Sequence, residues 1–224
     1  MFLNSEPLID FPRPTSHKIV EIGGITVSGG HKKLNAVMTE RVIAHEMEYL
    51  VQQWEITFSH GDLMTWDAIM SLRPQTVLLS FGTIAKSHLM PEEFKRTIRE
   101  TFRKFPDVTF IWKYEKPEDD IGKGIENIVP VTWMPQTDIL YDSRLSLFIT
   151  HGGQGSTTEV STAGVPVIVI PVISDQYRNA HVLVRSGVGL MLEKEDLAQE
   201  GPLEHAIRTV LEDNRQESEL TIRS

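Results

Sequence analysis

Residues 145–159 read L-S-L-F-I-T-H-G-G-Q-G-S-T-T-E, and this stretch decides the fold class. The apolar run Leu145–Thr150 predicts a buried strand of a parallel sheet, and the residues from Ser156 to about Ala163 predict a helix. Between them, the glycine-rich segment 151–155 is a sharp strand-to-helix turn. Because glycine has no Cβ atom, phosphate groups could approach the backbone N–H groups of this turn, where the helix dipole favours an anion.

The turn by itself does not decide between a structural and a functional interpretation. It could be an ordinary turn with Ser156 as the N-cap of the helix, since short glycine patterns often arise without a ligand. The next buried run, 166–170, is followed by Asp175 and Gln176. The carboxyl ends of parallel strands meet at one edge of a sheet, so these two side chains should emerge on the same edge as His151.

The side chains expected at this edge suit a nucleotide that carries a sugar. A carboxylate beside an amide offers acceptors and donors to vicinal sugar hydroxyls. Asp175 could instead cap the helix that follows it, and both roles can hold at once. Trp133 comes after the predicted strand 128–132. Its ring could fill the core, or its face could stack on a planar base.

Strands and helices alternate along most of the chain. The predicted strands are 76–80, 108–112, 128–132, 145–150, 166–170 and 188–192, and the predicted helices are 66–72, 91–105, a short one after Gln136, 156–163, 175–186 and 202–212. The helix 91–105 should have Pro91 at its first position, followed by acidic residues in the first turn. This alternation predicts an α/β fold with a doubly wound parallel sheet.

The segment from Trp133 to Gln176 resembles the donor-binding signature of the UDP-glycosyltransferases, the family of animal UDP-glucuronosyltransferases and plant secondary-product glycosyltransferases. The spacing matches without a gap, and the segments T-V-L-L-S-F-G-T (76–83) and F-I-W-K-Y-E (110–115) are most similar to the nematode branch. The resemblance covers nearly everything from Trp66 to the C-terminus, and residues 4–24. It implies a Rossmann-like sheet that forms the C-terminal, donor-binding domain of a GT-B fold.

The resemblance also implies a role for each matching residue. Trp133 would stack on uracil, with the Met134 backbone and Gln136 beside the base and ribose, and Glu159 would accept from the ribose hydroxyls. The diphosphate and the donor sugar would be bound by His151, Ser156, Gly152, Gly153, Gly82 and Thr83 on the phosphate side and by Asp175 and Gln176 on the sugar side.

Two positions depart from the family pattern. Asp142 stands where many relatives have histidine, and Gly155 stands where plant members have asparagine. The glycine removes a side chain that could contact phosphate, which leaves that contact to the backbone.

The resemblance divides the chain into three parts. Residues 1–36 would be the end of an N-terminal domain and a linker, with a strand within 17–27, and residues 66–224 would be the UDP-sugar-binding domain. Residues 37–65 resemble an insertion, and apolar residues at helical spacing predict a helix over 38–54. A lineage-specific element and a gene-model artefact both remain possible explanations of this insertion.

Composition limits the classes of function. A net charge of −9 argues against nucleic acid and anionic membranes as partners, and the absence of cysteine excludes disulfides and zinc-thiolate sites. The segment H-E-M-E-Y at 45–49 lacks the second histidine of a zincin, so no metal site is expected. No apolar run is long enough to span a bilayer, and we expect a soluble chain without a signal peptide, although the resemblance implies an enzyme at the endoplasmic reticulum membrane.

Two functions follow from the resemblance. The first is transfer of glucuronic acid or a hexose from a UDP-sugar to a hydroxyl of a small lipophilic acceptor, with the UDP-sugar as substrate and no cofactor. In the family the catalytic base lies in an N-terminal domain, so no catalytic residue is expected here and this chain by itself should be inactive. The second is a truncated, non-catalytic product that binds UDP-sugar, an N-terminal domain or a sister subunit.

Overall fold

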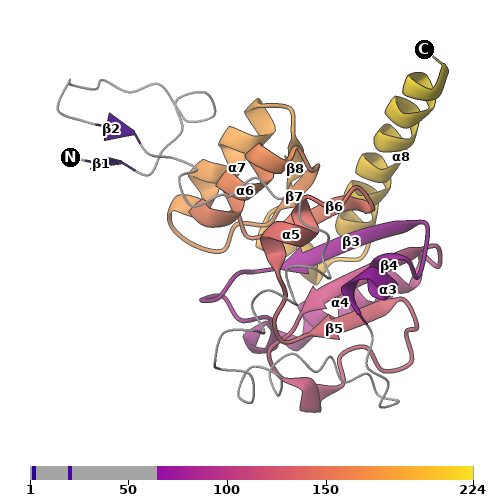
Figure 1. Cartoon of the computed structure of the whole chain (residues 1–224). Coiled ribbons are helices and arrows are strands. Elements are labelled where there is room, and N and C mark those ends of the chain that lie inside the picture. The colour runs from indigo at the N-terminus through magenta and orange to yellow at the C-terminus, as the bar shows by residue number, and fades with distance from the viewer. Residues whose placement is uncertain (1, 4–19, 22–64, 224) are drawn as a thin grey trace, which may run out of the picture.

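The computed structural model describes residues 2–3, 20–21 and 65–223 (Figure 1). Two short strands, β1 (Phe2–Leu3) and β2 (Val20–Glu21), pair in parallel. Of the predicted strand within 17–27, only β2 falls in the described part, while the predicted insertion and its helix over 38–54 lie outside the described residues apart from Thr65. Residues 65–223 form a layered α/β domain.

The domain is built on a six-stranded sheet in which all neighbouring strands run parallel. Its strands are β3 (Gln75–Ser80), β4 (Val108–Lys113), β5 (Ile128–Val131), β6 (Leu145–Thr150), β7 (Val167–Val169) and β8 (Gly189–Met191). Their spatial order is β5-β4-β3-β6-β7-β8, which is the 3-2-1-4-5-6 order of the Rossmann fold when β3 is counted as the first strand. The predicted doubly wound parallel sheet is therefore confirmed.

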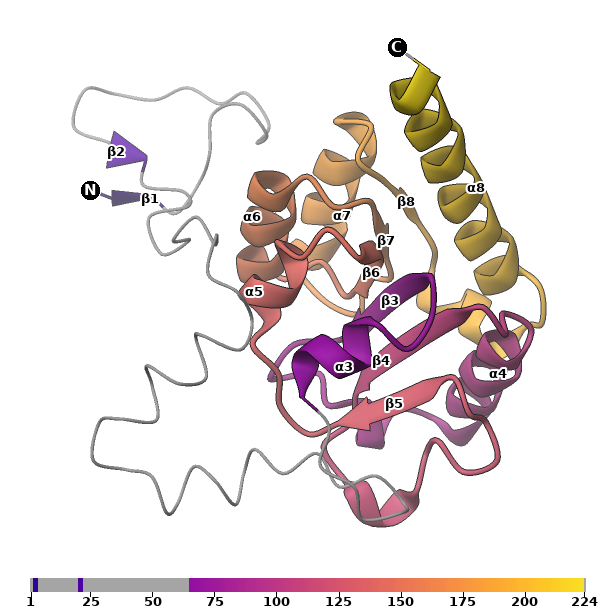
Figure 2. The same cartoon turned by 45° about the vertical axis from the view of Figure 1, so that its right-hand side comes forward.

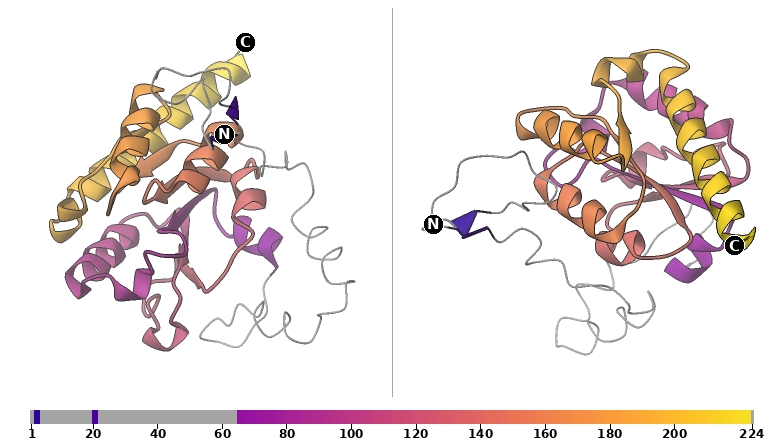
Figure 3. Two further views of the ribbon diagram at one scale, coloured as in Figure 1. Left: turned by 90° about the vertical axis from the view of Figure 1, so that its left-hand side faces the viewer. Right: turned by 90° about the horizontal axis from the view of Figure 1, so that it is seen from above.

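Helices cover both faces of this sheet (Figures 2 and 3). They are α3 (Trp66–Met70), α4 (Glu92–Arg103), α5 (Gln136–Leu140), α6 (Gln154–Ala163), α7 (Asp175–Arg185) and α8 (Pro202–Arg223), with 3₁₀ turns at Ser87–Leu89, Pro117–Asp119 and Lys194–Ala198. Buried residues of α4 and α8 belong to one core cluster, and those of α3, α5, α6 and α7 to a second. Among the described residues, no helix combines the length and apolar character that a membrane span requires.

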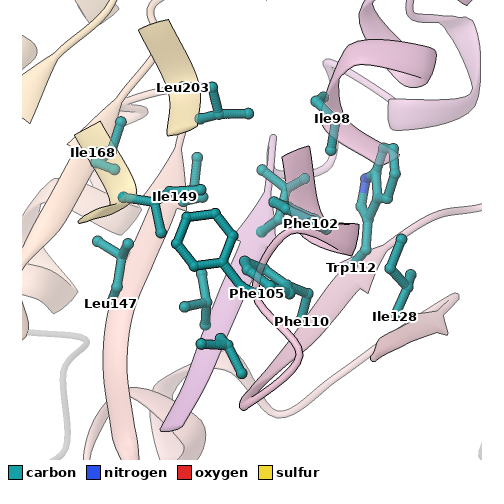
Figure 4. Packing of buried hydrophobic residues seen from close by; sticks show 14 of the residues in the cluster. Ile98, Phe102, Phe105, Phe110, Trp112, Ile128, Leu147, Ile149, Ile168 and Leu203 are labelled. Carbon is teal, nitrogen blue, oxygen red and sulfur yellow. The ribbon is translucent and has the colours of Figure 1, made fainter. Parts of the chain in front are cut away.

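Alternation along the buried strands separates the two cores. In β6, Leu147 and Ile149 face the cluster with α4 and α8, whereas Phe148 between them faces the opposite cluster. The first cluster is rich in aromatic rings (Figure 4). Phe102 of α4 stacks on Phe110 of β4 with ring centroids 3.7 Å apart, and the Trp112 ring meets Phe102 edge to face. This packing fixes the strands whose ends carry the candidate site.

Element boundaries follow the predictions closely, with two corrections at helix starts. Pro91 is the N-cap of α4 and not its first residue, because its extended ψ of 141° is not helical. Helix α6 begins at Gln154 with Gly153 as N-cap, so Ser156 lies inside the first turn and is not the cap. Helix α8 also runs past the predicted end at residue 212.

Asp142, which stands where relatives have histidine, has a structural partner. Its carboxylate accepts from the Arg144 guanidinium at 2.6 Å, and these hydrogen bonds lower the pKa of Asp142. The same guanidinium donates to Asp67 at 3.0 Å and to Ser71 at 2.7 Å. The loop before β6 is thereby joined to α3, so Asp142 belongs to the scaffold.

Candidate functional site

The candidate site lies where the sheet reverses its winding, between β3 and β6. Ligands of open α/β sheets bind outside the carboxyl ends of the strands at such a point. The turn after β3 carries Gly82, and the turn after β6 carries His151, Gly152 and Gly153. The two loops contact each other where the His151 ring lies against Gly82.

The imidazole of His151 packs between two glycines. A Cβ atom on Gly82 would lie 2.7 Å from His151 Cε1, and one on Gly153 would lie 2.7 Å from His151 Nε2. Any larger side chain at either position would therefore displace the ring. Gly82 also has φ of +78°, which disfavours other residues. These glycines serve to seat the histidine, a purpose that the sequence pattern alone did not reveal.

Burial favours the uncharged form of the His151 imidazole. Its burial lowers the pKa of the imidazole, the Asp175 carboxylate raises it, and the Lys113 ammonium lowers it again, with a net shift downward from 6.5. A neutral imidazole offers one N–H donor and one acceptor. Nδ1 lies 3.4 Å from the hydroxyl of Thr150, at the end of β6.

Lys113 brings a positive charge to this edge of the sheet. It is the last residue of β4, and its Nζ donates to the carbonyl of Gly82 at 2.5 Å and lies 3.5 Å from the Glu115 carboxylate. Glu115 in turn lies 3.4 Å from Nδ1 of His88. The sequence analysis did not single out Lys113. It is nevertheless a polar residue that follows the apolar run of β4, just as Asp175 and Gln176 follow the apolar run of β7.

The first turn of α5 contacts the first two turns of α6. Gln136, the first residue of α5, donates from Nε2 to the Glu159 carboxylate at 2.5 Å and to the Ser156 hydroxyl at 3.3 Å. Thr137 donates from its hydroxyl to the other oxygen of Glu159 at 2.7 Å. Three of the predicted site residues are thus in direct contact. Thr137 was not predicted, because nothing in the sequence indicates a bond across 22 residues.

Trp133 and Met134 occupy the loop between β5 and α5, and their side chains have opposite environments. Trp133 is 43% exposed, whereas Met134 is 5% exposed and packs in the core cluster with α3, α5, α6 and α7. The exposure of Trp133 excludes the core-filling interpretation of that ring. The side chain of Met134 anchors the loop in the core. Its backbone is therefore the part of the residue that could lie beside the base, as the resemblance implies.

The loop from β7 to α7 holds Asp175 and Gln176. Asp175 is exposed and is the first residue of α7, while the N-cap is Ser174, so Asp175 does not cap the helix. Gln176 is 7% exposed, and its Oε1 accepts from the backbone N–H groups of Val172 at 2.8 Å and Ile173 at 2.9 Å. The carboxamide oxygen therefore stabilises the loop, and its amide nitrogen is the atom available to donate to a ligand.

Strain marks the same loop. Ser174 has φ of +54° and ψ of −125°, a conformation that is unfavourable for residues other than glycine. Nearby, the carbonyl of Gly152 accepts from Asn179 of α7 at 2.9 Å. Asn179 is buried and ties the turn after β6 to α7, a second contact that sequence reasoning missed.

Two helix starts and one lysine are therefore directed to the same edge of the sheet. The first turns of α6 and α7 present backbone N–H groups, and Lys113 lies beside the Gly82 loop. Such an arrangement favours an anion. Thr83 is exposed in the Gly82 loop. Among the residues that the structure describes, no group of three or more His, Cys, Asp or Glu side chains is placed to hold a metal ion.

Comparison with known proteins shows the family of the chain. A family model described as UDP-glucuronosyl and UDP-glucosyl transferase matches residues 67–222. The chain belongs to the UDP-glycosyltransferase family. The match spans the whole sheet and every residue of the candidate site, so the resemblance inferred from the sequence is confirmed.

Relatives and solved structures extend the comparison to the fold. In Caenorhabditis elegans, ugt-55 and ugt-56 carry the name UDP-glucuronosyltransferase. The first is 34% identical across 96% of this chain and 36% of its own length, and the second is 38% identical across 67% and 29%. A crystal structure of the glycotransferase of kitacinnamycin superimposes with a TM-score of 0.53 at 27% identity, over 62% of this chain and 35% of that one. The domain is of the GT-B glycosyltransferase type, and the chain spans about a third of the length of these relatives.

Proposed function

We propose that this chain is the donor-binding half of a UDP-glycosyltransferase, which moves glucuronic acid or a hexose from a UDP-sugar to a hydroxyl of a small lipophilic acceptor. One observation carries the proposal. The His151 ring is seated between Gly82 and Gly153 at the switch point of the sheet, beside the first turn of α6. In this proposal the whole enzyme works at the endoplasmic reticulum membrane, as its resemblance to animal members implies.

The geometry supports a separate place for each part of the donor. In this proposal the exposed ring of Trp133 stacks on uracil, and Glu159 with Gln136 binds the ribose. The diphosphate would bind between His151 and the backbone N–H groups at the start of α6. Asp175 at the start of α7 is exposed and does not cap the helix, and its charge acts on the imidazole of His151 by raising the pKa of that ring, which suits Asp175 to the sugar hydroxyls.

These residues would act on the leaving group. As the glycosidic bond to UDP breaks, negative charge develops on the diphosphate, and fixed donors stabilise it without reorganisation. The neutral imidazole of His151 supplies one N–H, the first turn of α6 supplies backbone N–H groups, and Lys113 supplies a positive charge at the Gly82 loop. Deprotonation of the acceptor requires a base, which in the family belongs to the N-terminal domain.

Asp175 should distinguish a UDP-sugar from UDP. We expect Asp175→Ala to weaken binding of UDP-glucose or UDP-glucuronic acid by about 10–150-fold, since a hydrogen bond to a charged group contributes about 1.5–3 kcal/mol. The affinity for UDP should stay nearly constant, because the side chain makes no capping bond whose loss would alter α7. Titration calorimetry with the three ligands measures both effects. An equal loss for all three would assign Asp175 a structural role.

A second candidate is a non-catalytic protein that binds UDP-sugar or a sister subunit. It is supported by the same geometry, because binding of a UDP-sugar needs the donors around His151 and no general base. A transfer assay separates the two candidates. We expect no transfer to a phenolic acceptor by this chain alone and measurable transfer when a family N-terminal domain is added. Failure in the presence of a folded N-terminal domain would favour the non-catalytic candidate.

A further inference from the structure

Thr137 is the second residue of α5, and its hydroxyl donates to Oε1 of Glu159 at 2.7 Å. The other oxygen of Glu159, Oε2, accepts from Gln136 at 2.5 Å. Both oxygens of one carboxylate on α6 are therefore held by consecutive residues of α5. A glutamate side chain on a helix would otherwise sample several rotamers, so these two bonds fix the plane in which the carboxylate lies.

The number of acceptor positions left on Glu159 matches a vicinal diol. An ionised carboxylate has about four lone-pair sites, and Gln136 and Thr137 occupy one on each oxygen. One position on each oxygen remains, which suits two neighbouring hydroxyl donors that arrive together. If the bond to one oxygen were lost, the carboxylate could rotate. It would then bind a single hydroxyl nearly as well as a pair of neighbouring hydroxyls.

We propose that Thr137 is a positioning residue that holds Glu159 in the orientation needed to accept both ribose hydroxyls, and that it thereby sets the preference of this chain for ribonucleotides over deoxyribonucleotides. This inference rests on the proposed function, because it takes the ribose of UDP as the ligand of Glu159. It assigns the discrimination between ribose and deoxyribose in part to Thr137, a residue that does not itself contact the ligand.

Calorimetry with UDP and 2′-deoxy-UDP tests the proposal. We expect the unmodified chain to bind UDP more tightly by about 10-fold or more, because the deoxy ligand lacks one hydrogen bond to a charged group. Thr137→Val keeps the shape of the side chain and removes the donor. It should weaken UDP by about 10-fold and 2′-deoxy-UDP by less than about threefold, so the ratio of the two dissociation constants falls.

Three further variants make the test specific. Thr137→Ser keeps the hydroxyl and should keep the ratio. Thr162→Val is the matched control, because its hydroxyl lies on the exposed side of α6 and donates only to the backbone of Thr158, so the ratio should not change. In a Glu159→Ala background the ratio should be close to one, and adding Thr137→Val should not alter it.

The outcomes separate this inference from the proposed function. If the unmodified chain prefers UDP and Thr137→Val weakens both ligands equally, Thr137 only joins α5 to α6 and the inference is overturned. A changed ratio in the Glu159→Ala background would show that Thr137 acts on the ligand directly, which also overturns it. Absence of UDP binding by the unmodified, folded chain would refute the proposed function, and the inference would fall with it. Thr137→Ala replaces Thr137→Val if the valine variant does not fold.

Discussion

We expect Gly153→Ala to weaken UDP binding by about 10–150-fold, the loss that corresponds to one hydrogen bond to a charged group. The added methyl group would lie 2.7 Å from Nε2 and 2.9 Å from Cε1 of His151, so the ring must leave its place beside the first turn of α6. The backbone at Gly153, with φ of −61° and ψ of 151°, is open to alanine. The effect therefore comes from the displaced imidazole and not from backbone strain.

Gly155→Ala is the matched control for this experiment. A Cβ atom at Gly155 would meet nothing within 4 Å, and the residue lies in the first turn of α6. The substitution should leave the dissociation constant of UDP unchanged and stabilise the fold by up to about 1 kcal/mol, because alanine is the better helix former. Calorimetry and thermal melts on both variants give the comparison. Equal UDP affinity in both would show that His151 does not contact the ligand.

Trp133→Ala should be the most damaging single change to recognition of the base. Stacking of a base on an aromatic ring contributes about 1–3 kcal/mol, which corresponds to a loss of about 5–150-fold in affinity for UDP. Because the ring is 43% exposed, the melting temperature should fall little. Trp133→Phe keeps a stacking surface, so its affinity for UDP should lie between those of the unmodified chain and Trp133→Ala. A large fall in melting temperature with unchanged UDP affinity would assign Trp133 to packing.

The sheet could be predicted from the sequence because its signals are local. Each strand is a short apolar run, and the predicted bounds of β6 agree with the structure at both ends. Helix starts were harder, because the geometry of one turn decides them. Pro91 was predicted as the first helical residue and is the N-cap, and Ser156 was a possible N-cap and lies inside the helix. The sequence pattern shows which residues favour a helix start, but it does not show at which residue the backbone dihedrals become helical.

The sequence predicts members of the candidate site but not the contacts among them. Strand order brings His151 and Asp175 to one edge, as their positions after neighbouring strands indicated. The bonds from Lys113 to Gly82, from Thr137 to Glu159 and from Gln176 to its own loop depend on side-chain conformations in the folded chain. No local pattern encodes such contacts, because their partners come together only when the sheet is assembled.

The most direct measurement is calorimetric titration of the unmodified, folded chain with UDP, alongside ADP as a ligand of equal charge and a different base. We expect one UDP site per chain and weaker binding of ADP, because the proposed function puts the Met134 backbone and Gln136 beside the uracil that stacks on Trp133. Equal affinity for UDP and ADP would mean that the domain binds the diphosphate near His151 but does not recognise the base. A chain that melts cooperatively and binds no UDP would contradict the central claim that this domain holds the donor nucleotide.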